Sequence, residues 1–316
     1  MIELIDFTKC ELSDRNLQYG GRAGEKKGII YNNEYWFLKF PKNTIGMRKV
    51  DSLSYVTSPI SEYLGSNIYK ILGYEVHDTK LGICFDGKRY KVVCACKDFI
   101  KDDKNELLIP YTALRNDTNP LIMERRDTNI HSASNINEII FQLKYNAVLS
   151  KIKAVEERFW DVVLIDMLIN NNDRNEDNWG VIKYKKEDAY CLAPIYDCGN
   201  CFYGKTSEER IVEILKDESK LYSSAINGIT AYEDDDEKRI NAVKILDYIK
   251  INRPDTILRV YDKMLSNFIK IENFIYQIPN IFEGVIIISN DRKKYYLKTL
   301  KIRLDYIYEK YIKQLK

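Results

Sequence analysis

The stretch WDVVLIDMLINNNDRNEDNWGVIKYKKEDAYCLAPIYDCG, residues 160–199, decides how the rest of the chain is interpreted. It begins with an apolar segment, Trp160 to Ile169, whose apolar residues recur at helical spacing. An almost wholly polar loop follows over residues 170–178. Two strand-like segments come next, residues 179–184 and 189–195, joined by a charged turn. A second acidic segment, containing D-C-G, ends the stretch.

The polar segments at the two ends of this hairpin carry Asp173, Asn178 and Asp197. A hairpin brings its two ends together, so we expect these three side chains to converge. Carboxylate and carboxamide oxygens are ligands for a hard cation such as Mg²⁺, and this set leaves one carboxylate spare. Phosphoryl transfer needs such a set, because one Asp orients the attacking hydroxyl group while an Asn and a second Asp hold Mg²⁺ on the phosphates.

The spacing of these residues is typical of one enzyme class. Asp173 and Asn178 form the D-x-x-x-x-N pattern of a protein-kinase catalytic loop, and Asp197 begins D-C-G where kinases carry D-F-G. The alternative is a plain turn, because Asn and Asp tolerate left-handed backbone conformations. The acidic segment that follows one hairpin later favours the kinase interpretation.

The segments NNDRNEDNWG and PIYDCG resemble the HipA-like kinase family, particularly its compact CtkA-type members. The DRNEDNW core is also similar to the loop of type II phosphatidylinositol 4-kinases. The resemblance implies an atypical, two-lobed kinase fold of the α+β class, with a β-rich N-lobe over residues 1–99 and a helical C-lobe over residues 100–316. It also implies that Asp173 is catalytic, that Asn178 and Asp197 are metal ligands, and that ATP and Mg²⁺ are the cofactors.

A glycine-rich, basic segment, residues 19–28, precedes two strand-like segments and is predicted to hold the nucleotide phosphates. Glycines let backbone N–H groups approach phosphate oxygens, and basic side chains add charge. The predicted contacts are Gly20, Gly21, Arg22, Ala23, Gly24 and Lys26. A surface turn is the alternative, and the segment is not a Walker A motif. Because residues 20–28 contain no Ser or Thr, we do not expect the glycine-loop Ser switch of some HipA-like enzymes.

Lys39 lies among bulky apolar residues in the strand-like segment 35–40. It is either a snorkelling Lys at a sheet edge or the Lys that contacts nucleotide phosphates, and the order of segments in HipA-like kinases favours the second. Ser58 predicts the start of a helix and Gly73 its end. Glu62 in this helix is expected to pair with Lys39, the alternative being that it only favours the helix dipole.

Residues 94–99 end the predicted sheet and are expected to form the hinge that binds adenine. The predicted contacts are Cys94, Cys96, Asp98 and Phe99. Arg174 has two interpretations of equal weight. It either neutralises charge that develops during phosphoryl transfer, or it forms a salt bridge that holds the catalytic loop.

The remaining segments are expected to be mainly helical. Residues 100–133 are interpreted as a connector with short helices, and residues 136–149 as one helix. The C-terminal helices are predicted over Glu208–Lys216, Glu237–Ile249, Pro254–Phe268 and Asp291–Leu315. No A-P-E motif follows Asp197, which departs from ordinary protein kinases and agrees with the atypical family.

Composition excludes several other classes of protein. The 316 residues are 45% hydrophobic, which excludes a disordered chain, and the net charge of +2 gives no global field for nucleic acid or membrane. No membrane-spanning run and no signal peptide are evident, so a cytoplasmic location is expected. The two histidines, His77 and His131, are expected to lie distant from the motifs, so no histidine-based site is predicted.

Seven cysteines, an odd number, indicate reduced thiols. Cys94-x-Cys96 and Cys198-x-x-Cys201 together raise the alternative of a four-thiolate zinc site. The alternation along residues 92–96 instead favours small, buried hydrophobic residues.

The family resemblance implies a protein Ser/Thr kinase that phosphorylates proteins, itself included, and in some members an antitoxin-like partner. No direct nucleic-acid partner is expected. Two alternatives stay open: a lipid or small-molecule kinase, and a non-catalytic nucleotide-binding module on a kinase fold. The complete set Lys39, Glu62, Asp173, Asn178 and Asp197 argues against the second alternative.

Overall fold

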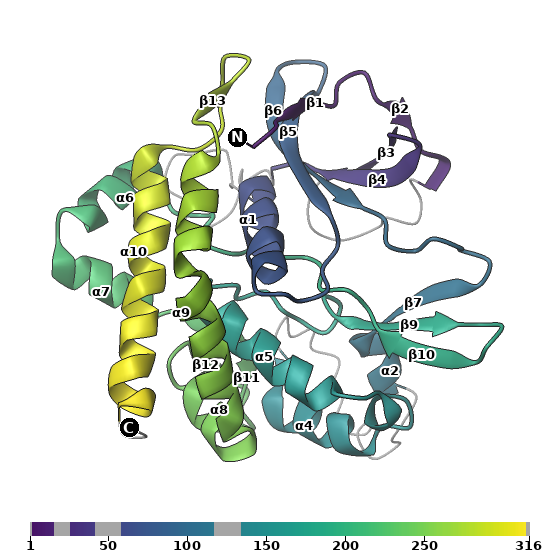
Figure 1. Cartoon of the computed structure of the whole chain (residues 1–316), viewed down its shortest axis with the longest axis vertical. Helices are drawn as coiled ribbons and strands as arrows, with labels where there is room; N and C mark the ends of the chain where they lie inside the picture. The colour runs from purple at the N-terminus through teal and green to yellow at the C-terminus, as the bar shows by residue number, and fades with distance from the viewer. Residues whose placement is uncertain (1, 16–25, 42–57, 117–133, 314–316) are drawn as a thin grey trace.

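A β-sheet with one packed helix forms the N-terminal part of the chain, and a mainly helical part follows (Figure 1). This computed structural model describes residues 2–15, 26–41, 58–116 and 134–313. Over these ranges, no helix has both the length and the apolar character needed to cross a membrane.

The N-terminal sheet has six strands in the order β1-β5-β6-β4-β3-β2. They are β1 (Ile5–Asp6), β2 (Glu11–Leu12), β3 (Lys26–Tyr31), β4 (Glu34–Lys39), β5 (Thr79–Phe85) and β6 (Tyr90–Lys97). Only β1 is parallel to its neighbour, β5. Asn32 and Asn33 both have positive φ and form the predicted turn between β3 and β4, because Asn tolerates this conformation.

Both faces of this sheet are apolar. Val93 and Ala95 of β6 lie in a small core with Trp36, whereas Cys94 and Cys96 point to the opposite face. That second face packs against α1 (Ser58–Ile71), which begins and ends within two residues of the predicted bounds. The alternation along β6 confirms the interpretation of its two cysteines as buried hydrophobic residues.

The predicted hairpin after the polar loop is present as β9 (Gly180–Tyr184) and β10 (Ala189–Leu192). A third strand, β7 (Glu106–Pro110), pairs with β9. The connector was expected to contain only short helices, which is wrong for this strand, although the short helix α2 (Tyr111–Asn116) follows it. The strand forms because β9 supplies hydrogen-bond partners from 70 to 78 residues further along the chain.

Helix α5 (Val155–Leu168) leads into the polar loop as predicted, and Asn170, at φ 55°, ends it with a left-handed residue. The helix expected over 136–149 ends early: α4 spans Ile136–Tyr145, and a separate 3₁₀ turn, η2, spans Leu149–Lys151. The cause is Asn146, whose side chain accepts hydrogen bonds from the backbone N–H groups of residues 148 and 149 and competes with the helix.

The C-terminal part is less uniformly helical than predicted. Its helices are α6 (Glu208–Leu215), α7 (Glu218–Ile226), α8 (Ile245–Asn252), α9 (Pro254–Gln277) and α10 (Asn290–Ile307), which a π turn, η3 (Tyr308–Ile312), extends. Strands β11 (Ile229–Glu233) and β12 (Arg239–Asn241) pair with each other, and β8 (Ser134–Asn135) joins β11. A short hairpin, β13 (Ile281–Phe282) and β14 (Val285–Ile286), separates α9 from α10.

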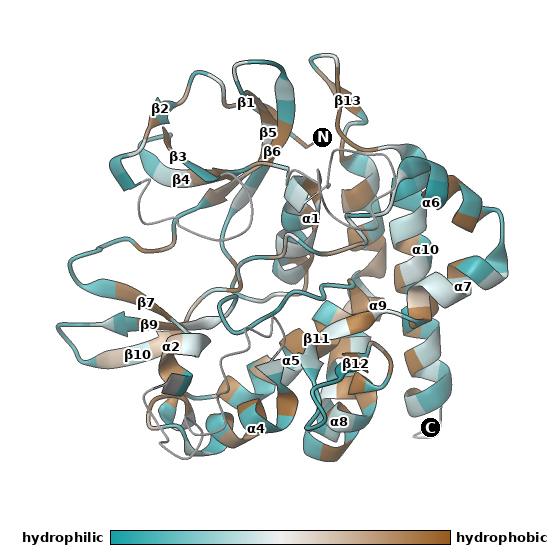
Figure 2. Cartoon of the chain, turned by 180° about the vertical axis from the view of Figure 1, so that it is seen from behind, coloured by the Kyte–Doolittle hydropathy of each residue, from teal (hydrophilic) through white to brown (hydrophobic). Residues whose placement is uncertain are grey.

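The helix predicted over Glu237–Ile249 was expected to begin at the acidic run Glu233–Glu237, which is wrong, because β12 lies there and α8 begins only at Ile245. Asp234, the second residue of this run, instead closes the β11–β12 turn by accepting hydrogen bonds from the backbone of Asp236 and Lys238. In Figure 2, α4, α5 and α8 carry apolar, brown bands, while the turn between β9 and β10 is hydrophilic and teal. The main core therefore lies among the helices and under α1.

Candidate active site

Lys39, Glu62 and Asp197 meet at one point, from a strand, a helix and a loop. The Lys39 Nζ donates to Glu62 Oε2 at 2.7 Å and to Asp197 Oδ1 at 2.9 Å. The predicted ion pair between Lys39 and Glu62 is therefore present. The Glu62 side chain is fully buried, whereas that of Asp197 is 37% exposed, so this front cluster opens to solvent on the Asp197 side.

The charges of the front cluster stabilise one another. Burial alone would lower the pKa of Lys39, but the carboxylates of Asp197 and Glu62 raise it well above its ordinary value. Burial likewise opposes ionisation of the two carboxyl groups, yet the Lys39 ammonium group lowers the pKa of both. Lys26 lies opposite Lys39 in the β3–β4 register, and its pKa is lowered by burial and by the Lys39 charge. Two neighbouring amines suit an anionic ligand such as a phosphate.

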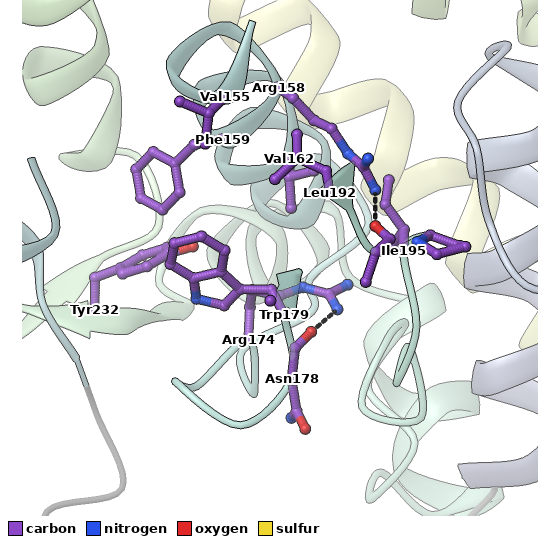
Figure 3. A pocket seen from close by; sticks show the side chains of 13 residues that line it. Val155, Arg158, Phe159, Val162, Arg174, Asn178, Trp179, Leu192, Ile195 and Tyr232 are labelled. Atoms are coloured by element: carbon purple, nitrogen blue, oxygen red, sulfur yellow. Dashed lines mark hydrogen bonds between the residues drawn. The ribbon is translucent and has the colours of Figure 1, made fainter. Parts of the chain in front are cut away.

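The loop after α5 positions Asp173 and Asn178. The Asn178 Nδ2 donates to the Asp173 backbone carbonyl at 2.6 Å, and the Asn175 Nδ2 lies 3.3 Å from Asp173 Oδ1. Because a carbonyl accepts and cannot donate, the Asn178 nitrogen is committed inward and its side-chain oxygen is directed elsewhere. The Asn178 amide points away from the cavity drawn in Figure 3. Its oxygen is thus placed to serve as a cation ligand.

Arg174 is buried beneath this loop and has acceptors for all five of its N–H groups. It forms an ion pair with Asp166 of α5 at 2.8 Å and donates to the carbonyls of Asn178 and Tyr196. One cation therefore joins the two acidic segments, as the hairpin predicts. Figure 3 shows its hydrogen bond to Asn178. Burial would lower the pKa of Arg174, but Asp166 raises it well above its ordinary value. This geometry matches the salt-bridge interpretation of Arg174.

The backbone of the D-C-G segment is shaped to approach α1. Asp197 has φ 56°, a left-handed conformation that Asp tolerates better than most residues. At Gly199 an added Cβ would lie 3.2 Å from Glu62 Oε2. A side chain at residue 199 would therefore press on the carboxylate that Lys39 binds.

Helix α1 in turn lies directly against this segment. A Cβ added at Gly65 would lie 2.7 Å from the Cβ of Cys198, so only glycine permits this approach. The Ser61 Oγ donates to the carbonyl of Cys201 at 2.7 Å, and the Tyr69 hydroxyl donates to Asp166 of α5 at 2.8 Å. Glu62 is thus carried by a helix that is attached to both parts of the chain.

The chain is 30% identical over 282 residues to the serine/threonine-protein kinase CtkA of Helicobacter pylori, an alignment that covers 88% of this chain and 81% of that protein. The chain belongs to the CtkA family of serine/threonine kinases. The crystal structure of a Helicobacter pylori proinflammatory kinase CtkA matches with a TM-score of 0.81 and 27% identity, covering 99% of both chains. No protein-family model matches the chain.

The fold is also that of HipA. A structure of HipA from Shewanella oneidensis, in complex with HipB and operator DNA, matches with a TM-score of 0.54 and 14% identity, over 96% of this chain and 73% of that one. The predicted α+β, HipA-like kinase fold is therefore confirmed by both structures.

Two of the predicted hinge residues in this CtkA family member lie inside the sheet. Cys94 and Cys96 are central in β6, where Cys94 pairs with Lys39 of β4 and with Leu81 of β5. Their side chains are fully buried, and burial raises the pKa of the Cys94 thiol well above its usual range. They contribute packing behind the front cluster.

The other two predicted hinge residues follow β6. Asp98 forms an ion pair with Arg15 at 3.1 Å, and the Phe99 ring lies 5.7 Å from that of Tyr196, the residue before Asp197. Phe99 thus lies beside the segment that carries Asp197, whereas the carboxylate of Asp98 is paired with Arg15. The glycine-loop contacts Gly20, Gly21, Arg22, Ala23 and Gly24 lie outside the residues that the structure describes.

His77 was expected to be distant from the motifs, and this is wrong. Its Nε2 lies 3.0 Å from Glu62 Oε1 and 3.2 Å from Ser66 Oγ. The proximity arises because residues 75–77 pair with Ile195, close to Asp197, although more than a hundred residues separate them. The strand-like run before His77 was the available signal, but its partner strand could not be identified from the sequence. His131 lies outside the described residues.

The zinc alternative finds no support in the arrangement of the cysteines. The thiols of the four candidate residues do not form one group with the spacing of metal ligands, and no disulfide joins Cys94, Cys96, Cys198 and Cys201. Within the described ranges, the metal-type donors that approach one another belong to Glu62, His77 and Cys96, within 4.8 Å. In that group the Lys39 ammonium already neutralises the Glu62 carboxylate.

A separate apolar cavity of about 40 Å³ lies behind the catalytic loop (Figure 3). Its lining includes Phe159 and Val162 of α5, Trp179 and Ile195. Nucleotide-sized ligands need sites of roughly 300–1,000 Å³, so this cavity is not the place for ATP. The front cluster remains the candidate active site.

Proposed function

We propose that this chain transfers the γ-phosphoryl group of ATP to Ser or Thr hydroxyl groups of proteins, itself included, with Mg²⁺ as the cofactor. The observation that best supports the proposal is the contact of Lys39 with both Glu62, at 2.7 Å, and Asp197, at 2.9 Å. It joins the phosphate-binding Lys to its helix partner and to a metal ligand. Membership of the CtkA family supports the choice of a protein acceptor.

The residues present fit a nucleotide with its metal. Asn178 directs a carboxamide oxygen away from its inward hydrogen bond, and Asp197 has one carboxylate oxygen on Lys39 and a second one beside it. Two such oxygen ligands suit Mg²⁺, which neutralises phosphate charge when it is bound. Lys39 and Lys26 bind the phosphates from the sheet, with the glycine-rich segment as the predicted cover. Asp98 and Phe99 border the adenine end.

Asp173 is the residue placed to act on the acceptor. Its carboxylate is partly exposed, and its backbone is held by Asn178 at 2.6 Å. It orients the acceptor hydroxyl group and takes its proton. The hydroxyl oxygen forms a bond to the γ-phosphorus while the bond from that phosphorus to the β–γ bridging oxygen breaks, and ADP leaves. Arg174 holds the loop in place for this step and does not touch the phosphates.

The test is transfer from γ-labelled ATP with Mg²⁺, comparing wild type with Asp173→Ala and Asp197→Ala. The assay contains the chain alone, a generic protein substrate, or phosphoinositide vesicles. Label on Ser or Thr of protein that both substitutions abolish is the expected result. Label on lipid alone would replace the proposal with the lipid-kinase alternative. Binding of Mg-ATP without label on any acceptor would favour the non-catalytic nucleotide-binding module, and failure to bind Mg-ATP would overturn the kinase proposal.

Two further expectations rest on the same family. An antitoxin-like partner is proposed because the HipA structure with the same fold contains HipB. Co-purification of a small protein with the chain expressed from its native locus, and loss of transfer activity in that complex, would support it. A cytoplasmic location stays a prediction, which cell fractionation with an antibody to the chain would test.

A further inference from the structure

We propose that His77 is a positioning residue, which holds the Glu62 carboxylate against Lys39 and ties it to the segment that carries Asp197. The inference rests on the proposed kinase function and adds a residue to the same site. His77 does not touch the nucleotide in this proposal; it acts through Glu62.

The first evidence is that the two oxygens of the Glu62 carboxylate have different partners. Its Oε2 accepts from Lys39 at 2.7 Å, and its Oε1 accepts from His77 Nε2 at 3.0 Å. A carboxylate bound at one oxygen can rotate about its last torsion, whereas one bound at both oxygens is fixed in plane and direction. Glu62 and the His77 ring are 0% and 1% exposed, so water does not replace either partner. His77 therefore sets the direction in which Glu62 meets Lys39.

The second evidence is where the His77 backbone is attached. Its N–H donates to the carbonyl of Ile195 at 3.2 Å, and the Ile195 N–H donates to the carbonyl of Glu75 at 2.9 Å. Ile195 precedes Asp197 by two residues. A closed ring of contacts results: Lys39 binds Glu62 and Asp197, while His77 binds Glu62 by its side chain and the Asp197 segment by its backbone. Removing His77 opens this ring without removing any residue that touches ATP.

The geometry also assigns the hydrogen on the imidazole. The Glu62 carboxylate only accepts, so Nε2 must donate. Nδ1 is buried and has no hydrogen-bond partner among the described residues, which places the hydrogen on Nε2 rather than on Nδ1. A Gln side chain can present an amide N–H near the Nε2 position, whereas Leu fills a similar volume without a donor. Comparing these two substitutions distinguishes the effect of losing the hydrogen bond from the effect of changing the packing.

The experiment compares His77→Leu, His77→Gln and a control, Asn67→Ala, in the labelled-ATP assay, each at several ATP concentrations. Asn67 ties α1 to Thr79 at 3.0 Å without contacting Glu62, so it controls for loosening of the helix. We expect His77→Leu to lower kcat/KM about 10- to 100-fold. This is the range found in metal sites when a group that orients a metal-binding side chain is removed. The kcat/KM of His77→Gln and that of Asn67→Ala should both lie within about threefold of the wild-type value.

Two results would overturn the proposal. One is a His77→Leu enzyme whose KM for ATP and kcat equal those of wild type per folded molecule. The other is an equal loss in His77→Leu and His77→Gln that follows only their loss of thermal stability. If wild type itself transfers no label in the same assay, the result would instead count against the proposed kinase function. Failure of the His77 proposal and failure of the kinase proposal can thus be told apart.

A measurement that needs no activity tests the same contact. The chain has only two histidines, so ¹⁵N NMR of the imidazoles, with His131→Gln for assignment, isolates the His77 signals. We expect the hydrogen on Nε2, and a shift of this signal in Glu62→Gln. An Nε2 that carries no hydrogen would overturn the proposed contact.

Discussion

Two cations, Lys39 of β4 and Arg174 of the loop after α5, differ in how much of their surroundings is open to solvent. Arg174 uses all five N–H groups on protein acceptors, and its side chain is 2% exposed. Lys39 contacts two carboxylates, one of which, Asp197, is 37% exposed. The rear pair, Arg174 with Asp166, is closed and fastens the backbone. The front cluster is open and can exchange its contacts for those of a ligand.

The comparison predicts that substitutions in the front cluster affect activity and those in the rear pair affect stability. The largest expected effect is on the front side. Asp197→Asn should lower kcat on the order of 10³-fold, equivalent to about 4 kcal/mol, because the charged group that we propose as a metal ligand is lost. Its free energy of unfolding should change by no more than about 1 kcal/mol, since the carboxylate is partly exposed. Label transfer and urea unfolding of one preparation measure both quantities.

On the rear side, Arg174→Met should lower the free energy of unfolding by about 3–5 kcal/mol, because it leaves Asp166 buried without its partner. Adding Asp166→Leu should restore part of this loss, since the unpaired charge then disappears. Urea denaturation of the single and double variants gives both values. An Arg174→Met variant that loses little stability but all transfer activity would contradict the comparison, because Arg174 would then take part in phosphoryl transfer.

Gly65 tests the contact that joins the two sides. Gly65→Ala places a methyl group 2.7 Å from Cys198 Cβ, which should cost about 1–3 kcal/mol of unfolding free energy by overpacking. It should also lower activity, since α1 and the D-C-G segment are pushed apart. Gly73→Ala, at the exposed end of α1, is the control for the effect of glycine alone, with open space around its Cβ but a strained φ of 83°. Thermal unfolding and label transfer separate the two effects.

The smallest expected effect is the response to pH around neutrality. Glu62 and Asp197 have lowered pKa values, so they stabilise the fold above their unfolded values of about 4 and lose this as the pH falls through their folded values. Lys39 has a raised pKa, so its contribution is complete below about pH 10 and is lost only as the pH rises through its folded value. The contribution of these three groups to the stability of wild type should thus be flat from about pH 5 to pH 9. A slope within that window, in urea titrations, would contradict the assigned charges.

The sequence predicted the front cluster and the catalytic loop because several of their residues are marked by local patterns. Asp173 and Asn178 have a fixed spacing in one loop, and Lys39 stands out as a charge in an apolar strand. His77 carries no such mark. Its role depends on the backbone pairing of residues 75–77 with Ile195. The short strand-like run at residues 74–76 does not indicate in the sequence which distant segment it pairs with.

The same reason explains the missed strands. β7 has only five residues, and its hydrogen-bond partners come from β9. β11 and β12 are joined by an acidic turn whose composition is also that of a helix start, so local propensity pointed to the wrong element. The interpretation of Arg174 could not be decided either, because all five of its acceptors are fixed by tertiary structure.

Helix α1 has a consequence for how the molecule unfolds. Ten of its fourteen residues are buried, between the six-stranded sheet on one side and the D-C-G segment and α5 on the other. Neither part can release the helix without exposing its own apolar face to water. We therefore expect one cooperative calorimetric transition instead of separate melting of the sheet and the helices. The place where a nucleotide would bind and the loops that would act on it are then lost in a single event.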